Sequence, residues 1–337
     1  MNANRLLSPL FPRMAIALAV SLGLAGMAIT PVPASAAAPM TNVQAPGFYN
    51  IMLGNFEITA LSDGTDDQPV DKLLSESATR TNAVLKKSFL KSPLETSVNA
   101  FLINTGSRLV LVDTGAGAWF GPTLGKLAVN LRAAGYKPGQ VDDILLTHMH
   151  PDHEGGLVAN GHRVFPNATV YASEKDADFW LSKTNMDKAA VHSASEPKSF
   201  FQDAIASLKP YMDAGKVHWF SHNSEVVPGV YSIASPGHTM GHTAYLVQSK
   251  GQKLLLIGDS IVVGAVQFKN PSVTVAYDTN PKEAIASRAK LFAQAAKDGD
   301  LVGGAHVSFP GLGHIAKEGK GWEWIPVNYT TELHRSL

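Results

Sequence analysis

The segment Thr147–Gly156, which reads THMHPDHEGG, constrains the fold of this chain more than any other stretch. It places His148, His150 and His153, three of the chain's 12 histidines, within six residues together with Asp152. The apolar run ILL just before it predicts a buried strand, and side chains two residues apart on an extended chain point the same way. Two glycines at its end allow another backbone to approach closely. The segment therefore predicts four metal-ligand side chains at the end of one strand.

Three further side chains of ligand type stand in the same kind of place. His238 follows the apolar run VYSIA, Asp259 follows LLLIG and His306 follows LVGG, each with a glycine within two residues. Burying such groups without a partner is costly. Seven ligands exceed the four of a tetrahedral ion, so the pattern predicts two metal ions. Because the chain contains no cysteine, histidine and carboxylate must supply the ligands.

Strand patterns alternate with helix patterns along the chain, which predicts mixed sheets covered by helices, an α/β fold. The runs NAFLIN and RLVLVDTG are joined by TGS, and AYLVQ and QKLLLIGDS by SKG, as in β-hairpins. Apolar residues at helical spacing predict three helices that end at glycine. These are Leu124, Leu127, Ala128 and Leu131 before Gly135; Phe201, Ile205, Leu208 and Met212 before Gly215; and Ile285, Ala289, Phe292 and Ala296 before Gly299, with Asn280 as the cap.

The first 36 residues have the pattern of a secretory signal peptide. Arg5 and Arg13 give a basic start, residues 14–29 are apolar and uncharged, and Ala34 and Ala36 occupy the small-residue positions before a cleavage point. We expect cleavage after Ala36 and a periplasmic or secreted protein that has no membrane association after cleavage. An uncleaved N-terminal anchor is the alternative, because both share this pattern. Neither a repeat nor a linker divides residues 37–337, which are predicted to form one domain.

The charge balance excludes one class of partner. Lysine and arginine number 28, and aspartate and glutamate also number 28. A protein that binds nucleic acid usually leaves a strongly basic footprint, so we expect no nucleic-acid partner. The absence of cysteine also excludes disulfides. Stability must come from a packed core, for which about 300 residues suffice.

The order H-x-H-x-D-H, followed by a distant His, Asp and His, resembles the metallo-β-lactamase superfamily. The upstream sequence VDTG, with Asp113, fits the same pattern. The resemblance implies a four-layer αββα sandwich with the site at one edge of the sheets. It also implies that Asp113 orients ligands from behind and that His242, four residues after His238, is a packed or hydrogen-bonded histidine. The implied ligands are His148, His150 and His238 for one metal, Asp152, His153 and His306 for the other, and Asp259 as a bridge.

A site of this kind suits hydrolysis at neutral pH. Two ions about 3.5–4 Å apart can share one hydroxide, because a metal lowers the pKa of bound water from 15.7 to about 7. Asp259 and Asp152 are the candidate catalytic residues. The ligand types suit zinc, manganese, cobalt and iron. The resemblance favours two zinc ions, because members with di-iron redox chemistry carry a carboxylate where this chain has His150. Asp259 argues against antibiotic hydrolysis, because the true β-lactamases of the family lack this bridge.

Longer stretches resemble the branch that contains methyl parathion hydrolase and its lactonase relatives, among them FEITALSDGT, PLETSVNAFLINTGSRLVLVDTGAG and SFPGLGHI. Relative to methyl parathion hydrolase, Leu73 replaces an arginine, Tyr277 replaces a small aliphatic residue, and the segment Val191–Pro197 is longer. These departures would narrow the mouth of the pocket and favour lactones or aryl esters. Core aromatics share this composition, so an ordinary core is the alternative for the implied pocket of Leu73, Phe120, Trp180, Phe200, Phe201, Val262 and Tyr277.

We therefore expect an exported, binuclear metal-dependent hydrolase of lactones or aryl esters, in which a metal-bridging hydroxide attacks the acyl carbon, with promiscuous organophosphate hydrolysis. The alternatives are a dedicated phosphotriesterase, an acyl-homoserine-lactone lactonase and, from another class, a non-catalytic metal-binding protein. The expected partner is a small uncharged aryl or lactone substrate. The resemblance also implies a homodimer.

Overall fold

The computed structural model describes residues 38–189, 197–221 and 223–333. The predicted signal peptide lies outside these residues, as does the segment Val191–Pro197 except for its last residue, so both remain predictions. The chain divides into two compact units, residues 1–44 and 45–337. In the first unit, the described residues 38–44 contain no helix or strand. Within the described ranges, no helix is both long and apolar enough to cross a membrane.

The first sheet in the described part of the second unit has seven strands. Its first four strands pair antiparallel, and β4, β5, β8 and β9 then run parallel. The hairpin predicted at TGS joins β3 to β4 and is confirmed. In spatial order the strands are β1 (Phe48–Leu53), β2 (Phe56–Gln68), β3 (Leu94–Asn104), β4 (Leu109–Val112), β5 (Asp143–Leu145), β8 (Thr169–Ser173) and β9 (Val217–Phe220).

The second sheet also has seven strands among the described residues, and only β13 and β14 pair parallel in it. The hairpin predicted at SKG joins β12 to β13 and is confirmed. The strands are β10 (Glu225–Val227), β11 (Val230–Ala234), β12 (Thr243–Ser249), β13 (Gln252–Leu256), β14 (Leu301–Gly303), β15 (Leu312–Glu318) and β16 (Gly321–Pro326). A separate two-stranded ribbon pairs β6 (Val158–Ala159) with β7 (His162–Arg163).

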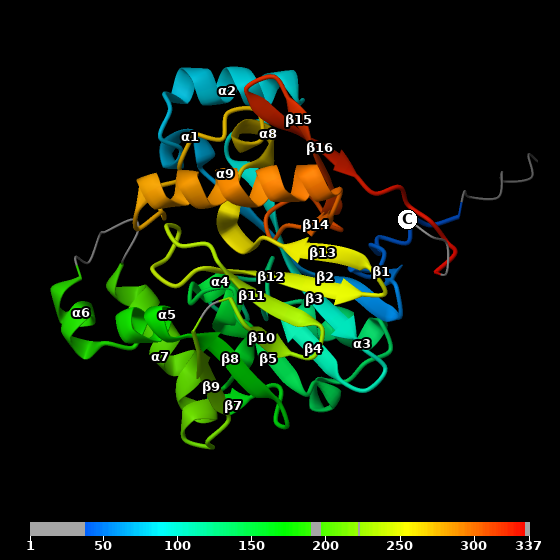
Figure 1. Cartoon of the computed structure of the whole chain (residues 1–337), viewed down its shortest axis with the longest axis vertical. Helices are drawn as coiled ribbons and strands as arrows, with labels where there is room; N and C mark the ends of the chain where they lie inside the picture. Colours follow the sequence, from blue (N-terminus) through cyan, green and yellow to red (C-terminus); the bar gives the residue numbers. More distant parts are fainter. Residues whose placement is uncertain (1–37, 190–196, 222, 334–337) are drawn as a thin grey trace, which may run out of the picture. The chain divides into compact units, whose positions relative to one another are not determined.

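The two sheets face each other, and helices cover their outer faces, which confirms the αββα sandwich (Figure 1). Between the sheets, Phe101 and Ile103 of β3 share a buried core with Tyr245 and Val247 of β12. Apolar residues of three helices pack on the first sheet, and those of one long helix pack on the second. These helices are α3 (Leu127–Ala133), α5 (Glu174–Trp180) and α7 (Lys198–Met212) on the first sheet, and α9 (Pro281–Asp298) on the second.

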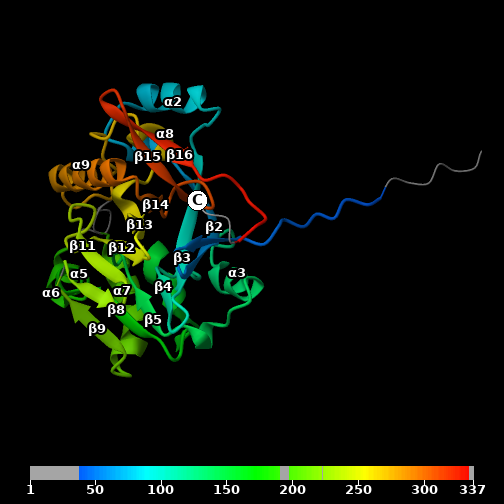
Figure 2. The ribbon, with the colours of Figure 1, turned by 45° about the vertical axis from the view of Figure 1, so that its right-hand side comes forward.

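Short helices complete the second unit. Helix α4 (Pro151–Glu154) follows β5, and α6 (Lys183–Lys188) follows α5. Helices α1 (Val70–Leu73), α2 (Ala78–Lys87) and α8 (Gly264–Gln267) gather around a small apolar cluster. Both views place α2 beside α8, although the two are far apart in the sequence (Figure 2). Val262 of this cluster, and Tyr277 packed against it, also line the cavity of the candidate site described below.

The three predicted helices form, but in two of them one predicted core residue is exposed and its neighbour is buried instead. In α9, Ala289 is exposed, whereas Arg288 is buried. The Arg288 guanidinium donates to the backbone oxygens of Ser260, Pro271 and Val273, at 2.5, 2.7 and 2.9 Å. These hydrogen bonds give the buried guanidinium its partners, although an arginine is expected from its residue type to be exposed. The predicted cap is confirmed, since the Asn280 side chain accepts from the backbone N–H of residue 283.

In α7 the predicted core residue Met212 is exposed, and its neighbour Tyr211 is buried. The Tyr211 hydroxyl donates to the Leu157 oxygen at 3.1 Å and accepts from the Phe165 N–H at 3.2 Å. A buried tyrosine hydroxyl with both partners is stable inside the fold, so the helix turns this side chain inward.

Candidate metal centre

All the predicted ligands lie where strands end. The segment His148–His153 follows β5 and enters α4, His238 follows β11, Asp259 lies in the 3₁₀ turn η3 (Gly258–Ser260) after β13, and His306 follows β14. The parallel pairs β4–β5 and β13–β14 bring the carboxyl ends of their strands to the same edge of each sheet. The first sheet therefore supplies four ligands of the cluster, and the second sheet supplies the other three, His238, Asp259 and His306.

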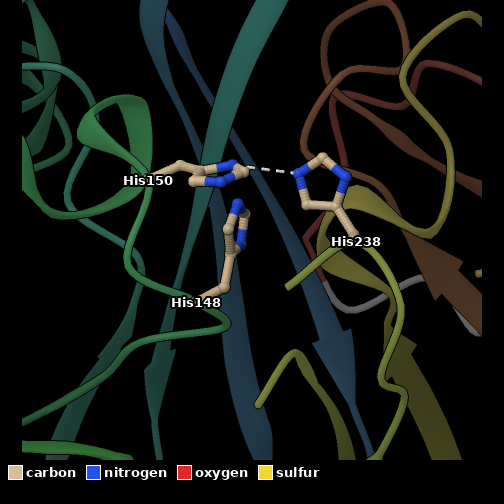
Figure 3. A group of neighbouring side chains, drawn as sticks. All are labelled: His148, His150 and His238. Atoms are coloured by element: carbon tan, nitrogen blue, oxygen red, sulfur yellow. Dashed lines mark hydrogen bonds between the residues drawn. The ribbon is translucent and has the colours of Figure 1, made fainter. Parts of the chain in front are cut away.

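His148, His150 and His238 form one group, with a ligand atom from each within 4.8 Å of the others. Figure 3 shows their rings converging, His148 and His150 from one segment and His238 from the opposite side. His150 Nδ1 lies 3.0 Å from His238 Nε2. Among the described residues, the buried Nε2 atoms of His148 and His150 have no hydrogen-bond partner. Three buried imidazoles whose ring nitrogens converge, two of those nitrogens without a hydrogen-bond partner, fit a cation site.

Asp152, His153, Asp259 and His306 form the adjoining group. His306 Nε2 lies 3.0 Å from Asp259 Oδ2 and 3.3 Å from Asp152 Oδ2. His153 Nε2 lies 3.1 Å from Asp259 Oδ1, yet neither atom has a partner in hydrogen-bonding geometry within the described chain. Asp259 also approaches His238, with 3.3 Å between Oδ2 and Nε2. It thus stands between the two groups, as a bridging ligand would.

The electrostatics of the cluster fit divalent cations. Burial lowers the pKa of His148 and of His150 well below 6.5, so both imidazoles are neutral, as metal ligands must be. Burial would also lower the pKa of His306, but Asp259 and Asp152 raise it to about 10. Burial alone would raise the pKa of Asp259, but His306 and His153 hold it well below 3.8. Burial would also lower the pKa of His153, but Asp259, Asp152 and Asp113 raise it well above 6.5, so without metal both His306 and His153 favour a proton that cation binding would release.

Asp113 lies behind the ligands that follow β5. Its backbone has a positive φ of 60°, a conformation that aspartate tolerates better than most residues. Its carboxylate accepts from the N–H and the hydroxyl of Thr147, both at 2.8 Å, and lies 2.9 Å from His153 Nδ1. A carboxylate on the far nitrogen fixes the tautomer, so that Nε2 of His153 is presented to the centre.

Two further orienting contacts lie outside the sequence predictions. Asp278 Oδ1 is 2.8 Å from His238 Nδ1, and the backbone oxygen of Ser97 is 2.9 Å from His306 Nδ1. Asp278 lies in a turn before α9, in a stretch with no motif, and Ser97 acts through its main chain. Neither contact leaves a pattern in the residue types, although a buried carboxylate beside a ligand is the usual partner of a metal-bound histidine.

His242 is buried and hydrogen-bonded at both ring nitrogens. Its Nδ1 lies 3.0 Å from the Ser235 oxygen, and its Nε2 accepts the Asp259 N–H at 3.0 Å. Nδ1 therefore carries the proton. Gly258 must be glycine here, because its φ is 47° and a Cβ would lie 2.6 Å from His242 Nε2. His242 thus fixes the main chain that carries Asp259.

Replacing His242 with glutamine is expected to make the free energy of unfolding of the metal-free protein fall less steeply as the pH is lowered. Burial lowers the pKa of His242 to about 3. Below pH 6.5 the unfolded chain binds a proton here that the folded chain does not, so the free energy of unfolding falls as pH falls from 6.5 toward 3. Urea unfolding with a chelator at several pH values measures the slope. The exposed His162→Gln should leave it unchanged, and an equal slope in His242→Gln would contradict the prediction.

A cavity opens directly onto the cluster. It is lined by the ligands His150, Asp152, His238, Asp259 and His306, and by Asp66, Gln68, Thr96, Val98, Phe120, Leu124, Phe200, Val262 and Tyr277. Four of the seven predicted pocket residues, Phe120, Phe200, Val262 and Tyr277, are in this lining. Phe120 is 39% exposed at the mouth. The sequence did not predict the polar side formed by Asp66 and Gln68. Both residues lie in β2, where the alternating pattern indicates a strand and gives no sign of a binding site.

Leu73, Trp180 and Phe201 do not line the cavity, which corrects the prediction for them. Trp180 and Phe201 are buried in the core under the first sheet, with ring centroids 4.7 Å apart. Trp180 still supports the site, because its ring packs 5.3 Å from that of His150. Leu73 packs beside Tyr277 in the cluster around α1, and its oxygen accepts the N–H of residue 276 at 2.8 Å. Core packing, which residue type does not reveal, decides these three positions.

Comparison with known families agrees with this geometry. Residues 94–306, which include Asp113 and all seven predicted ligands, match the family model of the metallo-beta-lactamase superfamily. The chain belongs to the metallo-beta-lactamase superfamily. Its sheets, its covering helices and the position of its metal site at the strand ends are those of this fold.

Solved metallo-beta-lactamase structures resemble this chain over most of its length. A hydrolase of the superfamily named AbOPH is 36% identical, with a TM-score of 0.80 over 86% of this chain and 100% of that one. AidC, a dizinc quorum-quenching lactonase, is 28% identical, with a TM-score of 0.76 over 85% of this chain and 99% of that one. An N-acyl homoserine lactonase from Bacillus cereus is 26% identical over 39% of this chain and 43% of its own length. The chain spans less than half the length of the first curated relatives that it matches.

Proposed function

We propose that this protein is a binuclear metal-dependent hydrolase of lactones and aryl esters, with zinc as its metal, exported after cleavage at Ala36 and assembled as a homodimer. One observation carries the catalytic proposal: unpartnered imidazole nitrogens and a carboxylate oxygen of two adjoining ligand groups lie buried beside one cavity. The similarity to AidC, a dizinc lactonase, supports both the metal and the substrate class.

The residues of the site divide the work of such a reaction. When bound, two divalent cations would bring the pKa of a bound water toward neutrality and polarise the acyl oxygen of a substrate. His148, His150 and His238 would hold one cation and Asp152, His153 and His306 the other, with Asp259 touching both. Asp152 and Asp259 also line the cavity, as Asp66 does, so a bound substrate would lie against these carboxylates.

The cavity favours an uncharged substrate with an apolar part and a polar part. Phe120, Phe200 and Val262 give it an apolar wall. On its polar side, the Tyr277 hydroxyl donates to Gln68 Oε1 at 3.2 Å, and Gln68 Nε2 donates to Asp66. The Asp66 carboxylate disfavours anionic substrates, whereas the Gln68 amide, held at both ends, can still offer an N–H to a carbonyl oxygen. A neutral lactone or ester meets both conditions.

A comparison of kcat/KM across substrate classes tests the proposal. The zinc-loaded protein is expected to hydrolyse dihydrocoumarin and an N-acyl homoserine lactone at least about tenfold better than methyl parathion, a difference of about 1.4 kcal/mol in transition-state binding. The reason is that the Gln68 amide on the polar side of the cavity can donate to the carbonyl oxygen of a lactone or ester, which suits an acyl group better than a phosphotriester. A clear preference for methyl parathion would instead identify a dedicated phosphotriesterase. A folded protein that binds metal and turns over none of the three would identify a non-catalytic metal-binding protein.

A further inference from the structure

Asp176 joins the two segments that carry one complete ligand group. It lies in α5, outside the metal site, and it is buried. Its carboxylate accepts the N–H of Met149 at 3.1 Å, and Met149 stands between His148 and His150. It also accepts the Thr239 hydroxyl at 2.9 Å and the Gly241 N–H at 2.6 Å, on the segment that carries His238. One side chain therefore positions the backbone next to all three histidines of this group.

The surroundings of Asp176 are built around this contact. A Cβ at Gly241 would lie 2.5 Å from the backbone nitrogen of Asp176 and 2.5 Å from Ser173 Oγ, so only glycine allows the segment to come this close. The carboxylate has no cationic partner among its hydrogen bonds in the described chain, and burial raises its pKa to about 6 although the three bonds lower it. Keeping a carboxylate here costs folding free energy, which indicates a role in positioning.

The other ligand group has orienting contacts of its own. Asp113 fixes His153, and the Ser97 oxygen fixes His306. Neither contact includes Asp176. Asp113 also accepts from Thr147, whose hydroxyl lies 3.0 Å from His148 Nδ1, so Asp113 reaches both groups. Because the hydrogen bonds of Asp176 in the described chain go to Met149, Thr239 and Gly241, a defect at Asp176 should weaken the cation held by His148, His150 and His238 more than the other cation.

We infer that Asp176 is a positioning residue that sets the geometry, and hence the affinity, of the cation held by His148, His150 and His238. The inference rests on the binuclear centre proposed above. Asparagine at this position keeps the shape of the side chain but turns an N–H₂ group toward donors, so at least one of the three bonds is lost. Loss of such a supporting bond typically weakens metal binding about 10–100-fold.

Metal content in zinc buffers of decreasing free concentration tests this inference. The wild-type protein is expected to hold two zinc ions per chain. As free zinc is lowered, Asp176→Asn should lose one ion at a concentration about 10–100-fold higher than the concentration at which the wild type loses it. Adding His306→Ala to Asp176→Asn should remove the remaining ion, whereas adding His238→Ala should not. Equal affinity for both ions in Asp176→Asn and the wild type would overturn the inference and leave the proposed function intact. A wild-type protein that binds no metal would overturn both.

Two controls separate positioning from general destabilisation. Asp143→Asn changes another buried aspartate, which pairs with Arg108 at 2.6 and 2.7 Å, and should lower stability while both ions stay bound. Thr239→Val removes one bond to Asp176 and should weaken the same ion, whereas Thr239→Ser keeps the hydroxyl and should restore it. If Asp176→Asn does not fold, the Thr239 pair decides, and equal zinc affinity in Thr239→Val and the wild type would overturn the inference.

Discussion

Replacing Asp259 with alanine is expected to lower kcat/KM for lactones by more than about 100-fold, because loss of a residue that merely supports a ligand already costs about 10–100-fold in affinity or activity. Asp259 is the carboxylate that approaches His153, His238 and His306 at 3.0–3.3 Å. Its removal leaves the two ligand groups without a shared anion. Steady-state kinetics on zinc-loaded protein, with metal content measured on the same sample, checks the prediction.

Asp298→Ala is the matched control for Asp259→Ala. Asp298 is a carboxylate at the end of α9 that pairs with Lys253 at 3.1 Å, far from the ligand groups in the fold. Its removal should leave kcat/KM and metal content unchanged. An Asp259→Ala protein with wild-type turnover and two bound ions would show that the bridge between the groups is unnecessary and that the proposed centre is wrong.

Arg288→Met is expected to lower the free energy of unfolding by about 3 kcal/mol or more. Methionine fills a similar volume, but it leaves the backbone oxygens of Ser260, Pro271 and Val273 without their donor. Each buried acceptor that loses its partner costs about 1–3 kcal/mol. Because Ser260 follows Asp259, the variant should also bind metal more weakly. Urea unfolding of the metal-loaded and metal-free proteins measures both effects.

Arg132→Met separates this effect from a general loss of positive charge. Arg132 is exposed on α3 and donates to the Ala128 oxygen at 3.0 Å. Exposed substitutions of this kind usually change stability by no more than about 0.5 kcal/mol. Equal urea midpoints for Arg288→Met and Arg132→Met would contradict a structural role for the buried guanidinium.

The class of fold and the ligand cluster could be predicted because their signals are local. A short motif at the end of an apolar strand places His148, His150 and His153 without knowledge of distant contacts. His238, Asp259 and His306 repeat the same arrangement of strand end and glycine. The hairpins at TGS and SKG follow from turn residues between alternating strands. Each of these features depends on neighbours within about ten residues.

The remaining features depend on contacts between distant segments. Asp176 contacts a main-chain N–H and Asp278 contacts an imidazole, each on a distant segment. No residue spacing in the sequence therefore predicts these contacts. Arg288 is buried because three carbonyl oxygens from two other segments surround it. Phe120 and Trp180 have the same aromatic character, yet one lines the cavity and the other lies in the core. Packing between elements decides these cases, and residue type does not determine it.

Because the ligands are divided between two sheets, bound cations would hold the sheets together as well as take part in the chemistry. A cation that binds only when both strand edges are in register opposes their separation, by about 2.7 kcal/mol when its free concentration is 100 times its dissociation constant. The same coupling acts in reverse. A substitution that loosens the apolar layer around Tyr245, remote from every ligand, would appear as a lower affinity for metal. The zinc affinity therefore reports how stably the two sheets of the sandwich pack against each other.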